Sequence, residues 1–161
     1  MKGKKFYLVL HNVRSAYNVG AIFRTADGAG VDHIYLTGYT PTPPDKSQIY
    51  TTKPERMIIK TALGAQEYIT WSQHTTFAEV AKDLKGKNVQ IVALEQDANS
   101  VDYRAFISCG DTALVLGNEP VGIDAETLDL CDIMIEIPMR GQKNSLNVSV
   151  AAGIAIYALI D

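Results

Sequence analysis

Short runs of aliphatic and β-branched residues alternate along the chain with longer segments in which apolar residues recur at helical spacing. Turn-forming residues bound the short runs, which lie at residues 6–10, 33–36, 89–94, 112–116 and 133–137. The last three are typical of strands that are covered on both faces, as in a parallel sheet. The helical segments lie at residues 19–29, 77–84, 125–130 and 146–160. This alternation predicts a three-layer α/β domain with a mainly parallel sheet.

Residues 37–52 interrupt the alternation. Pro41, Pro43 and Pro44 lie there among Thr, Gly, Asp and Ser, so the segment can form neither a long helix nor a central strand. We therefore predict a long loop. Loops of this length in compact domains often bind ligands or act as lids, and a mobile surface connection is an equal alternative.

The 161 residues suit one compact domain, and no change of composition marks a boundary, so we expect residues 1–161 to form a single domain. The sequence has no apolar run long enough to span a membrane and no apolar core of a signal peptide, which predicts a cytoplasmic protein without a membrane partner. Cys109 and Cys131 lie far apart without a partner motif, so we expect two buried thiols in a reducing compartment.

The formal net charge of −3 argues against a nucleic-acid-binding protein, because such proteins usually carry excess positive charge. The charges are unevenly distributed, however. Residues 1–60 hold nine Lys or Arg against four Asp or Glu, a balance of +5, and residues 61–161 hold six against fourteen, a balance of −8. The cations of the first segment either contact phosphates or form a solvated surface. They include Arg14, Arg24, Lys53, Arg56 and Lys60.

Several common cofactor and catalytic motifs are missing from the sequence. It contains no glycine-rich dinucleotide fingerprint, no P-loop and no nucleophile elbow of an α/β hydrolase. His11, His33 and His74 lie too far apart for a local metal motif, and neither cysteine has a CxxC neighbour. We therefore predict that the protein binds no metal.

Three polar clusters follow predicted strands, which is where ligands bind in open α/β sheets. The first cluster, residues 12–26, contains Asn18, a suitable N-cap for the following helix, and Arg24 in the second turn. Ile22 and Phe23 flank Arg24, so its stem could pack while its guanidinium reaches a pocket. An ordinary capped helix with a surface arginine would have the same pattern.

In the second cluster, residues 114–123, a strand ends in a turn that contains Gly117 and Glu119. Gly117 would either let a ligand approach the backbone closely or only meet the backbone requirements of a tight turn.

The third cluster, residues 137–149, leads into an apolar helix that Asn144 or Ser145 could cap. Beyond Val150 this helix is apolar on all sides, so we expect it to be buried in the core or against a second subunit.

In their order and spacing, the segments NVGAIFRTA, LVLGNEPVGI and IPMRGQKNSLNVSVAAGIAIY resemble the three motifs of the SpoU or TrmH family of SPOUT RNA 2′-O-methyltransferases. The resemblance implies an enzyme that methylates a ribose 2′-hydroxyl of tRNA or rRNA, with S-adenosyl-L-methionine as its cofactor. It also implies a homodimer with the C-terminal helix in the interface and a C-terminal deep trefoil knot, which general folding rules would not predict. Because the first motif begins near Asn12, we expect no N-terminal RNA-binding extension of the kind that many relatives carry.

The resemblance also implies roles for individual residues. The knot would form the cofactor pocket, which would consist of Leu94, Glu95, Gly117, Ile137, Met139, Ser145 and Leu146. The catalytic positions would be Arg24, Asn18, Glu119, Ser145 and Asn147. In this assignment Asn18 holds Arg24 or the RNA, and Glu119 orients other groups rather than acting as a base. Phosphates near the pocket would be bound by Arg14, Arg140 and Lys143.

Arg24 matches the position that the family associates with activation of the ribose hydroxyl. A guanidinium stays protonated and has no acceptor, so either a substrate phosphate helps to draw a proton from Arg24, or the charged side chain stabilises the developing alkoxide. We favour the second mechanism.

Two alternatives to ribose methylation remain: a SPOUT enzyme that methylates a base, and a non-catalytic RNA-binding module of the same fold. The arginine and the SLNVS segment favour ribose methylation.

Overall fold

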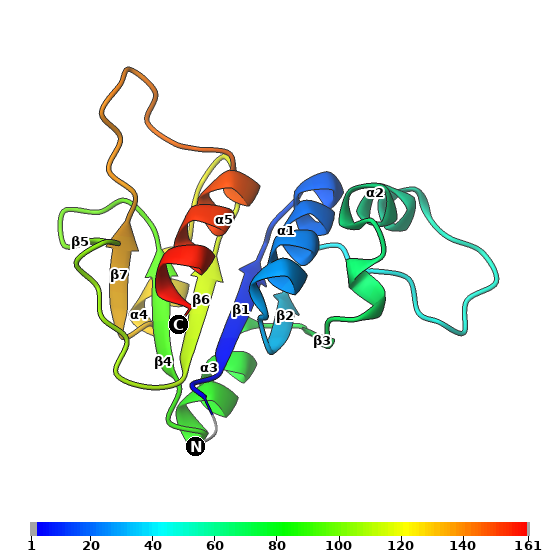
Figure 1. Cartoon of the computed structure of the whole chain (residues 1–161), viewed down its shortest axis with the longest axis horizontal. Coiled ribbons are helices and arrows are strands. Elements are labelled where there is room, and N and C mark those ends of the chain that lie inside the picture. The colour runs from blue at the N-terminus through cyan, green and yellow to red at the C-terminus, as the bar shows by residue number, and fades with distance from the viewer. Residues whose placement is uncertain (1–2, 161) are drawn as a thin grey trace.

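The computed structural model describes residues 3–160 and contains a seven-stranded sheet in which all strand pairs are parallel (Figure 1). The strand order across the sheet is β3-β2-β1-β6-β4-β7-β5. The strands are β1 Phe6–His11, β2 His33–Thr37, β3 Trp71–His74, β4 Gln90–Leu94, β5 Val101–Asp102, β6 Thr112–Leu116 and β7 Ile133–Glu136. The predicted parallel sheet and its five apolar strands are confirmed, whereas the hydrophobic pattern did not predict the edge strands β3 and β5.

Helices cover both faces of the sheet, which confirms the predicted three layers. One face carries α1 Ala16–Ala29, α2 Lys53–Ala62, the short 3-10 helix η1 Ala65–Glu67 and α5 Val148–Leu159, and the other carries α3 Phe77–Gly86 and α4 Ala125–Asp129. Alternate residues of β1 serve the two cores, since Leu8 and Leu10 pack beneath α1 and α5 while Tyr7 and Val9 pack beneath α3. Each fully buried leucine contributes about 1.5–3 kcal/mol through the hydrophobic effect.

The hydrophobic pattern did not predict α2, although the sequence contains its N-terminal signals. Thr52 and Glu55 form a capping box, and Pro54 lies in the first turn. The helix packs tightly on α1, where a Cβ at Gly20 would collide with the backbone carbonyl of Ile58. This close contact places α2 directly beside α1, on the same face of the sheet as α5 (Figure 1).

Both predicted helix caps are wrong. Ser15 caps α1, because its hydroxyl accepts a hydrogen bond from the backbone N–H of Asn18 (3.3 Å). The helix therefore begins earlier than predicted, and Asn18 lies inside its first turn. Asn147 caps α5 in place of Asn144 or Ser145, since its side chain accepts hydrogen bonds from two N–H groups of the first turn.

The predicted loop between β2 and α2 is confirmed, because residues 38–52 contain neither helix nor strand. The prediction of two buried thiols is wrong for Cys109, which lies exposed in the connection before β6. Cys131 is half-buried, and burial raises the pKa of its thiol to about 12. Across residues 3–160, no helix combines the length and apolar character that crossing a membrane requires.

Candidate active site

A cleft of about 430 Å³ lies at the carboxyl ends of β4, β6 and β7, the position at which open α/β sheets bind ligands. We call residues 117–123, which follow β6, the braced wall, and residues 137–146, which follow β7, the open wall. The end of β4 and the first turns of α5 complete the cleft. Its lining includes Leu94, Glu95, Gly117, Ile137, Met139, Ser145 and Leu146. The fold thus brings together all seven residues to which the resemblance assigned the cofactor pocket.

The cleft is also lined by residues that were not predicted from the sequence. Asn118 and Gly122 belong to the second motif, whereas Glu136, Val148 and Ala151 come from β7 and α5. All five lie within or next to the motif segments, and this proximity is the signal that could have indicated them. Motif position does not show which side chains face a cleft, however.

Hydrogen bonds hold the braced wall in a tight turn. The backbone N–H of Gly122 donates to the carbonyl of Asn118 (2.8 Å), and the N–H of Asn118 donates to the carbonyl of Gly122 (3.2 Å). The Glu95 carboxylate accepts a hydrogen bond from the N–H of Ile123 (2.9 Å). Gly122 has a φ of 72°, and a Cβ there would collide with the Glu95 carboxylate, so this position requires glycine.

Gly117, the first residue of the braced wall, packs against Ile123 at its other end. A Cβ at Gly117 would lie 2.5 Å from Cγ1 of Ile123 and 2.9 Å from its backbone nitrogen. The close packing of the turn therefore requires the glycine, although the residue also faces the cleft.

Glu119 connects the braced wall to the N-terminus of α1. Its carboxylate accepts hydrogen bonds from the backbone N–H groups of Arg14 (3.0 Å) and Ser15 (3.1 Å) and from Nδ2 of Asn18 (3.2 Å). Burial raises the pKa of this carboxyl, but the hydrogen bonds outweigh burial, so its pKa lies below the ordinary value. A carboxylate in this state is a poor general base and a good anchor for the groups around it.

Asn18 joins residues of all three motifs. Its Nδ2 donates to Glu119, and its Oδ1 accepts a hydrogen bond from Nδ2 of Asn147 (3.2 Å) at the start of α5. Within one chain Asn18 bonds Glu119 and Asn147 rather than Arg24, and the alternative that it holds the RNA stays a prediction. The three motifs therefore meet at one hydrogen-bonded junction next to the cleft.

Arg24 lies apart from this junction. Its side chain is exposed on α1 and does not line the cleft. In the part of the chain that the structure describes, no hydrogen bond or ion pair joins its guanidinium to another residue. Within one chain, the structure thus separates Arg24 from the other four residues assigned to catalysis.

The open wall differs from the braced wall in both exposure and bonding. Arg140 and Lys143 are exposed, as is Arg14, whose backbone N–H donates to Glu119 of the braced wall. Residues 138–146 form no hydrogen bond with any described residue, and the segment projects away from the sheet (Figure 1).

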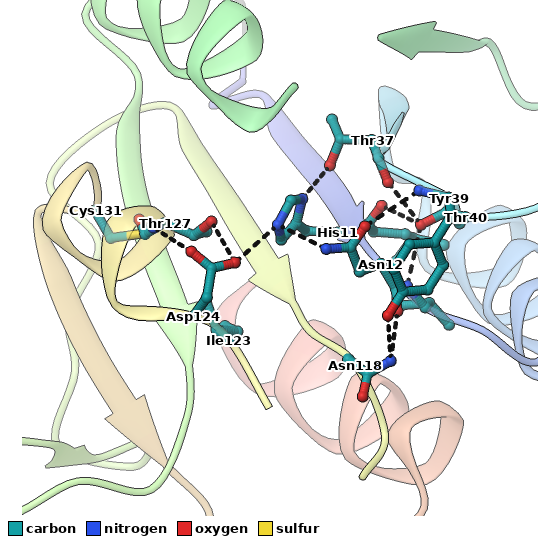
Figure 2. A network of polar contacts seen from close by, with 12 residues as sticks. His11, Asn12, Thr37, Tyr39, Thr40, Asn118, Ile123, Asp124, Thr127 and Cys131 are labelled. Carbon is teal, nitrogen blue, oxygen red and sulfur yellow. Dashed lines mark hydrogen bonds and ion pairs between the residues drawn. The ribbon is translucent and has the colours of Figure 1, made fainter. Parts of the chain in front are cut away.

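A second polar network lies at the carboxyl ends of β1 and β2 and reaches α4 (Figure 2). The buried His11 imidazole contacts Oγ1 of Thr37 through Nδ1 (2.8 Å) and the Asp124 carboxylate through Nε2 (3.1 Å). Burial raises the pKa of Asp124, but hydrogen bonds from Thr127 and His11 outweigh burial and lower it. His11 thus connects β1 to β2 and to the start of α4. Its position at the end of a buried strand is the signal in the sequence that could have indicated this structural role.

The chain is similar to RNA methyltransferases over most of its length, since residues 5–157 match the SpoU rRNA Methylase family. It is 32% identical over 148 residues to the tRNA (guanosine(18)-2′-O)-methyltransferase of Escherichia coli (strain K12), covering 92% of this chain and 59% of that protein. It is 36% identical over 156 residues to the 23S rRNA (guanosine-2′-O-)-methyltransferase RlmB of Pectobacterium atrosepticum, covering 96% of this chain and 59% of that protein. The chain thus spans less than two thirds of the length of these relatives.

Solved structures show the same fold. The TrmH/SpoU tRNA modifying enzyme of A. aeolicus superposes with a TM-score of 0.80 at 30% identity, covering 98% of this chain and 74% of that one. The AdoMet-bound rRNA methyltransferase from Sinorhizobium meliloti superposes with a TM-score of 0.84 at 28% identity, covering 98% of this chain and 56% of that one.

Proposed function

Because the chain belongs to the SpoU rRNA methylase family, as its three motifs predicted, we propose that it transfers a methyl group from S-adenosylmethionine to a ribose 2′-hydroxyl of tRNA or rRNA. The observation that carries this proposal is the hydrogen-bonded junction of Glu119, Asn18 and Asn147 beside the cleft. It joins three segments that lie far apart in the sequence and that together match the family motifs.

The cleft has the size and chemistry to hold S-adenosylmethionine. Its volume of about 430 Å³ lies within the range of small-molecule sites. Apolar side chains of Leu94, Ile137 and Leu146 suit a purine ring, while the carboxylate of Glu136 suits a positively charged ligand. When bound, the cofactor supplies a methyl group on a positively charged sulfur. Its binding residues would be Leu94, Glu95, Gly117, Ile137, Met139, Ser145 and Leu146.

We propose that the C-terminal segment forms the deep trefoil knot implied by the resemblance. After β7 the chain returns across β4, and α5 packs against α1 and β6. The return path is the open wall, which faces the braced wall across the cleft. Threading of this segment through the loop after β6 would place the cofactor between two crossing segments of the knot.

We propose that a second copy of the chain completes the site, because Arg24 does not line the cleft of its own chain. α5 presents an apolar outward face, on which Val150 is 51% exposed and Tyr157 is 62% exposed. A two-fold dimer buries the same face of both copies. Since α5 begins at the cleft and packs beside α1 (Figure 1), pairing through this face would bring Arg24 of one copy near the cleft of the other.

In this site the chain would orient the ribose hydroxyl, whose proton would pass to water, and would stabilise the negative charge that develops on the oxygen. Orientation alone supplies roughly 7–11 kcal/mol in well-aligned reactions. Arg24 suits charge stabilisation because a guanidinium stays protonated. Glu119, whose pKa is lowered by its hydrogen bonds, would hold Asn18 and the N-terminus of α1 in place rather than remove the proton.

Exposed cations surround the site and suit the RNA backbone. Those assigned from the motifs, Arg14, Arg140 and Lys143, are all exposed. The outward face of α2 adds a basic stripe, which consists of Lys53, Arg56 and Lys60. We propose that these side chains bind phosphates, so the net charge of −3 conceals a local positive surface.

The decisive experiment is to incubate the purified chain with isotopically labelled S-adenosylmethionine and bulk tRNA or rRNA, and to map the modified atom by mass spectrometry of nucleosides. Label on a ribose 2′-oxygen supports the proposal. Label on a base would instead identify a base methyltransferase. No transfer, combined with no S-adenosylmethionine binding in a calorimetric titration, would identify a non-catalytic RNA-binding module.

Variants of Arg24 test the proposed stabilisation of charge. We expect Arg24→Lys to retain measurable methyl transfer, because a lysine keeps the positive charge, and Arg24→Ala to lose nearly all of it. The measurement is the single-turnover rate at saturating cofactor, with cofactor affinity as the control. Equal loss in the two variants would contradict charge stabilisation as the role of Arg24.

A further inference from the structure

Tyr39 is an exposed aromatic residue that is fixed at both ends. It lies just after β2, at the start of the long loop, and is 60% exposed. Its hydroxyl accepts a hydrogen bond from Nδ2 of Asn118 (2.7 Å), and its backbone N–H donates to Oδ1 of Asn12 (3.1 Å) (Figure 2). An exposed tyrosine on a long loop does not belong to a hydrophobic core, so neither hydrogen bond is needed to stabilise one.

The backbone beneath Tyr39 is held in an uncommon conformation. Asn12 has a φ of 55° and Gly38 a φ of 65°, and a Cβ at Gly38 would collide with the Asn12 side chain. Thr40 ties the same segment to β1, because its hydroxyl donates to the carbonyl of Leu10 (2.8 Å) and accepts from the N–H of Val13 (3.1 Å). Glycine adopts a positive φ readily, but a non-glycine residue such as Asn12 keeps one only where the surrounding contacts determine the conformation, and such residues concentrate at functional sites.

The second anchor of Tyr39 belongs to the cleft. Asn118 lines the cleft within the braced wall, and its amide donates both to the Tyr39 hydroxyl and to the carbonyl of Asn12 (3.1 Å). Its Oδ1 accepts from the N–H of Val121 (3.1 Å). Tyr39 is therefore attached through its hydroxyl to the same turn that forms one side of the cleft, while the residue remains 60% exposed.

We propose that the Tyr39 ring is a stacking site for an unpaired nucleobase of the RNA substrate, beside the nucleotide whose ribose enters the cleft. The inference rests on the proposed RNA methylation and adds a base-binding site to it. Every base has an aromatic face, and single-stranded RNA is commonly bound by stacking on tyrosine. Because the ring is already fixed, stacking would order few additional groups.

The test compares a short labelled single-stranded RNA with an abasic ribose-phosphate strand of the same length and charge, by fluorescence anisotropy. We expect the wild-type chain to bind the base-containing strand roughly 5- to 100-fold more tightly, as a stacked base provides. Tyr39→Leu should abolish this difference and leave binding of the abasic strand unchanged. Tyr39→Phe should keep most of it, because the ring remains.

Tyr68→Leu is the matched control, since Tyr68 is 79% exposed but lies at the end of η1. It should retain the base-dependent difference. An undiminished difference in Tyr39→Leu would overturn the stacking site, and so would equal loss in Tyr39→Phe, which would assign Tyr39 to the support of Asn118 alone. Methyl transfer by the wild-type chain tests the proposed function separately, so normal transfer with either result would leave the function standing and remove only this site.

Discussion

The two walls of the cleft are constructed in opposite ways. The braced wall is closed by two backbone hydrogen bonds between Asn118 and Gly122, and Glu95 and Glu119 tie it to neighbouring elements. Over the open wall, residues 138–146 form no hydrogen bond with any part of the described chain. Both walls nevertheless line the same cleft and match family motifs.

This difference indicates that the two walls contribute differently to ligand binding. A wall whose backbone groups are already paired can position a ligand without further ordering. A wall with free backbone groups can pair them with a ligand, and the cost of ordering that segment then reduces the affinity. We infer that the braced wall sets the position of the cofactor, while the open wall orders around it and sets how readily it leaves.

We expect the largest effect when alanine replaces a glycine of the braced wall, compared with the same replacement in the open wall. Gly117→Ala would push a Cβ to 2.9 Å from the backbone nitrogen of Ile123, so the turn must shift. We expect a loss of stability of about 1–3 kcal/mol and at least about tenfold weaker S-adenosylmethionine binding. Gly141→Ala is the matched control, because nothing lies within 4 Å of a Cβ there. Thermal unfolding measures the stability of the two variants, and calorimetry measures their affinity for S-adenosylmethionine. Equal effects in the two variants would show that the walls do not differ.

A second effect should follow from cofactor binding, and it should be confined to the open wall. Arg140 and Lys143 are exposed sites for trypsin in that wall, and Lys46 is an exposed site in the loop before α2. S-adenosylmethionine at 100 times its Kd should slow cleavage in the open wall by up to about 100-fold and leave cleavage at Lys46 unchanged. Mass spectrometry of the fragments over time gives the rates. Unchanged cleavage at Arg140 would show that the open wall does not order around the ligand.

The central sheet was predictable because its strands are buried on both faces and therefore read as continuous apolar runs, such as residues 112–116. The edge strands were not predictable from that signal. β3 Trp71–His74 contains Ser, Gln and His and is only partly buried, and β5 Val101–Asp102 has two residues. In α2, the capping box was present in the sequence, but cations occupy most of its outward face.

The site was predictable as a set of residues but not as a set of contacts. The motifs gave the seven residues assigned to the cofactor pocket, all of which line the cleft. They could not show that Asn18 bonds Glu119 and Asn147, because those partners lie 101 and 129 residues away in the sequence. Nor could they show that Arg24 is exposed and does not line the cleft of its own chain, because motif position does not give the direction of a side chain.

The smallest expected effect concerns acid, and it tests the anchor of the braced wall. Hydrogen bonds lower the pKa of Glu119 in the folded chain below its ordinary value of 4.5. A lowered pKa stabilises the fold above that ordinary value, and the contribution is lost as the pH falls through the folded pKa. The free energy of unfolding should therefore fall more steeply below pH 4.5 in the wild type than in Glu119→Gln, which carries no titrating carboxyl at this position. Urea unfolding at a series of pH values measures the two slopes. Glu126→Gln removes an exposed carboxyl from α4 and controls for the change of charge. Equal slopes in Glu119→Gln and the wild type would mean that the carboxylate does not anchor the braced wall to α1.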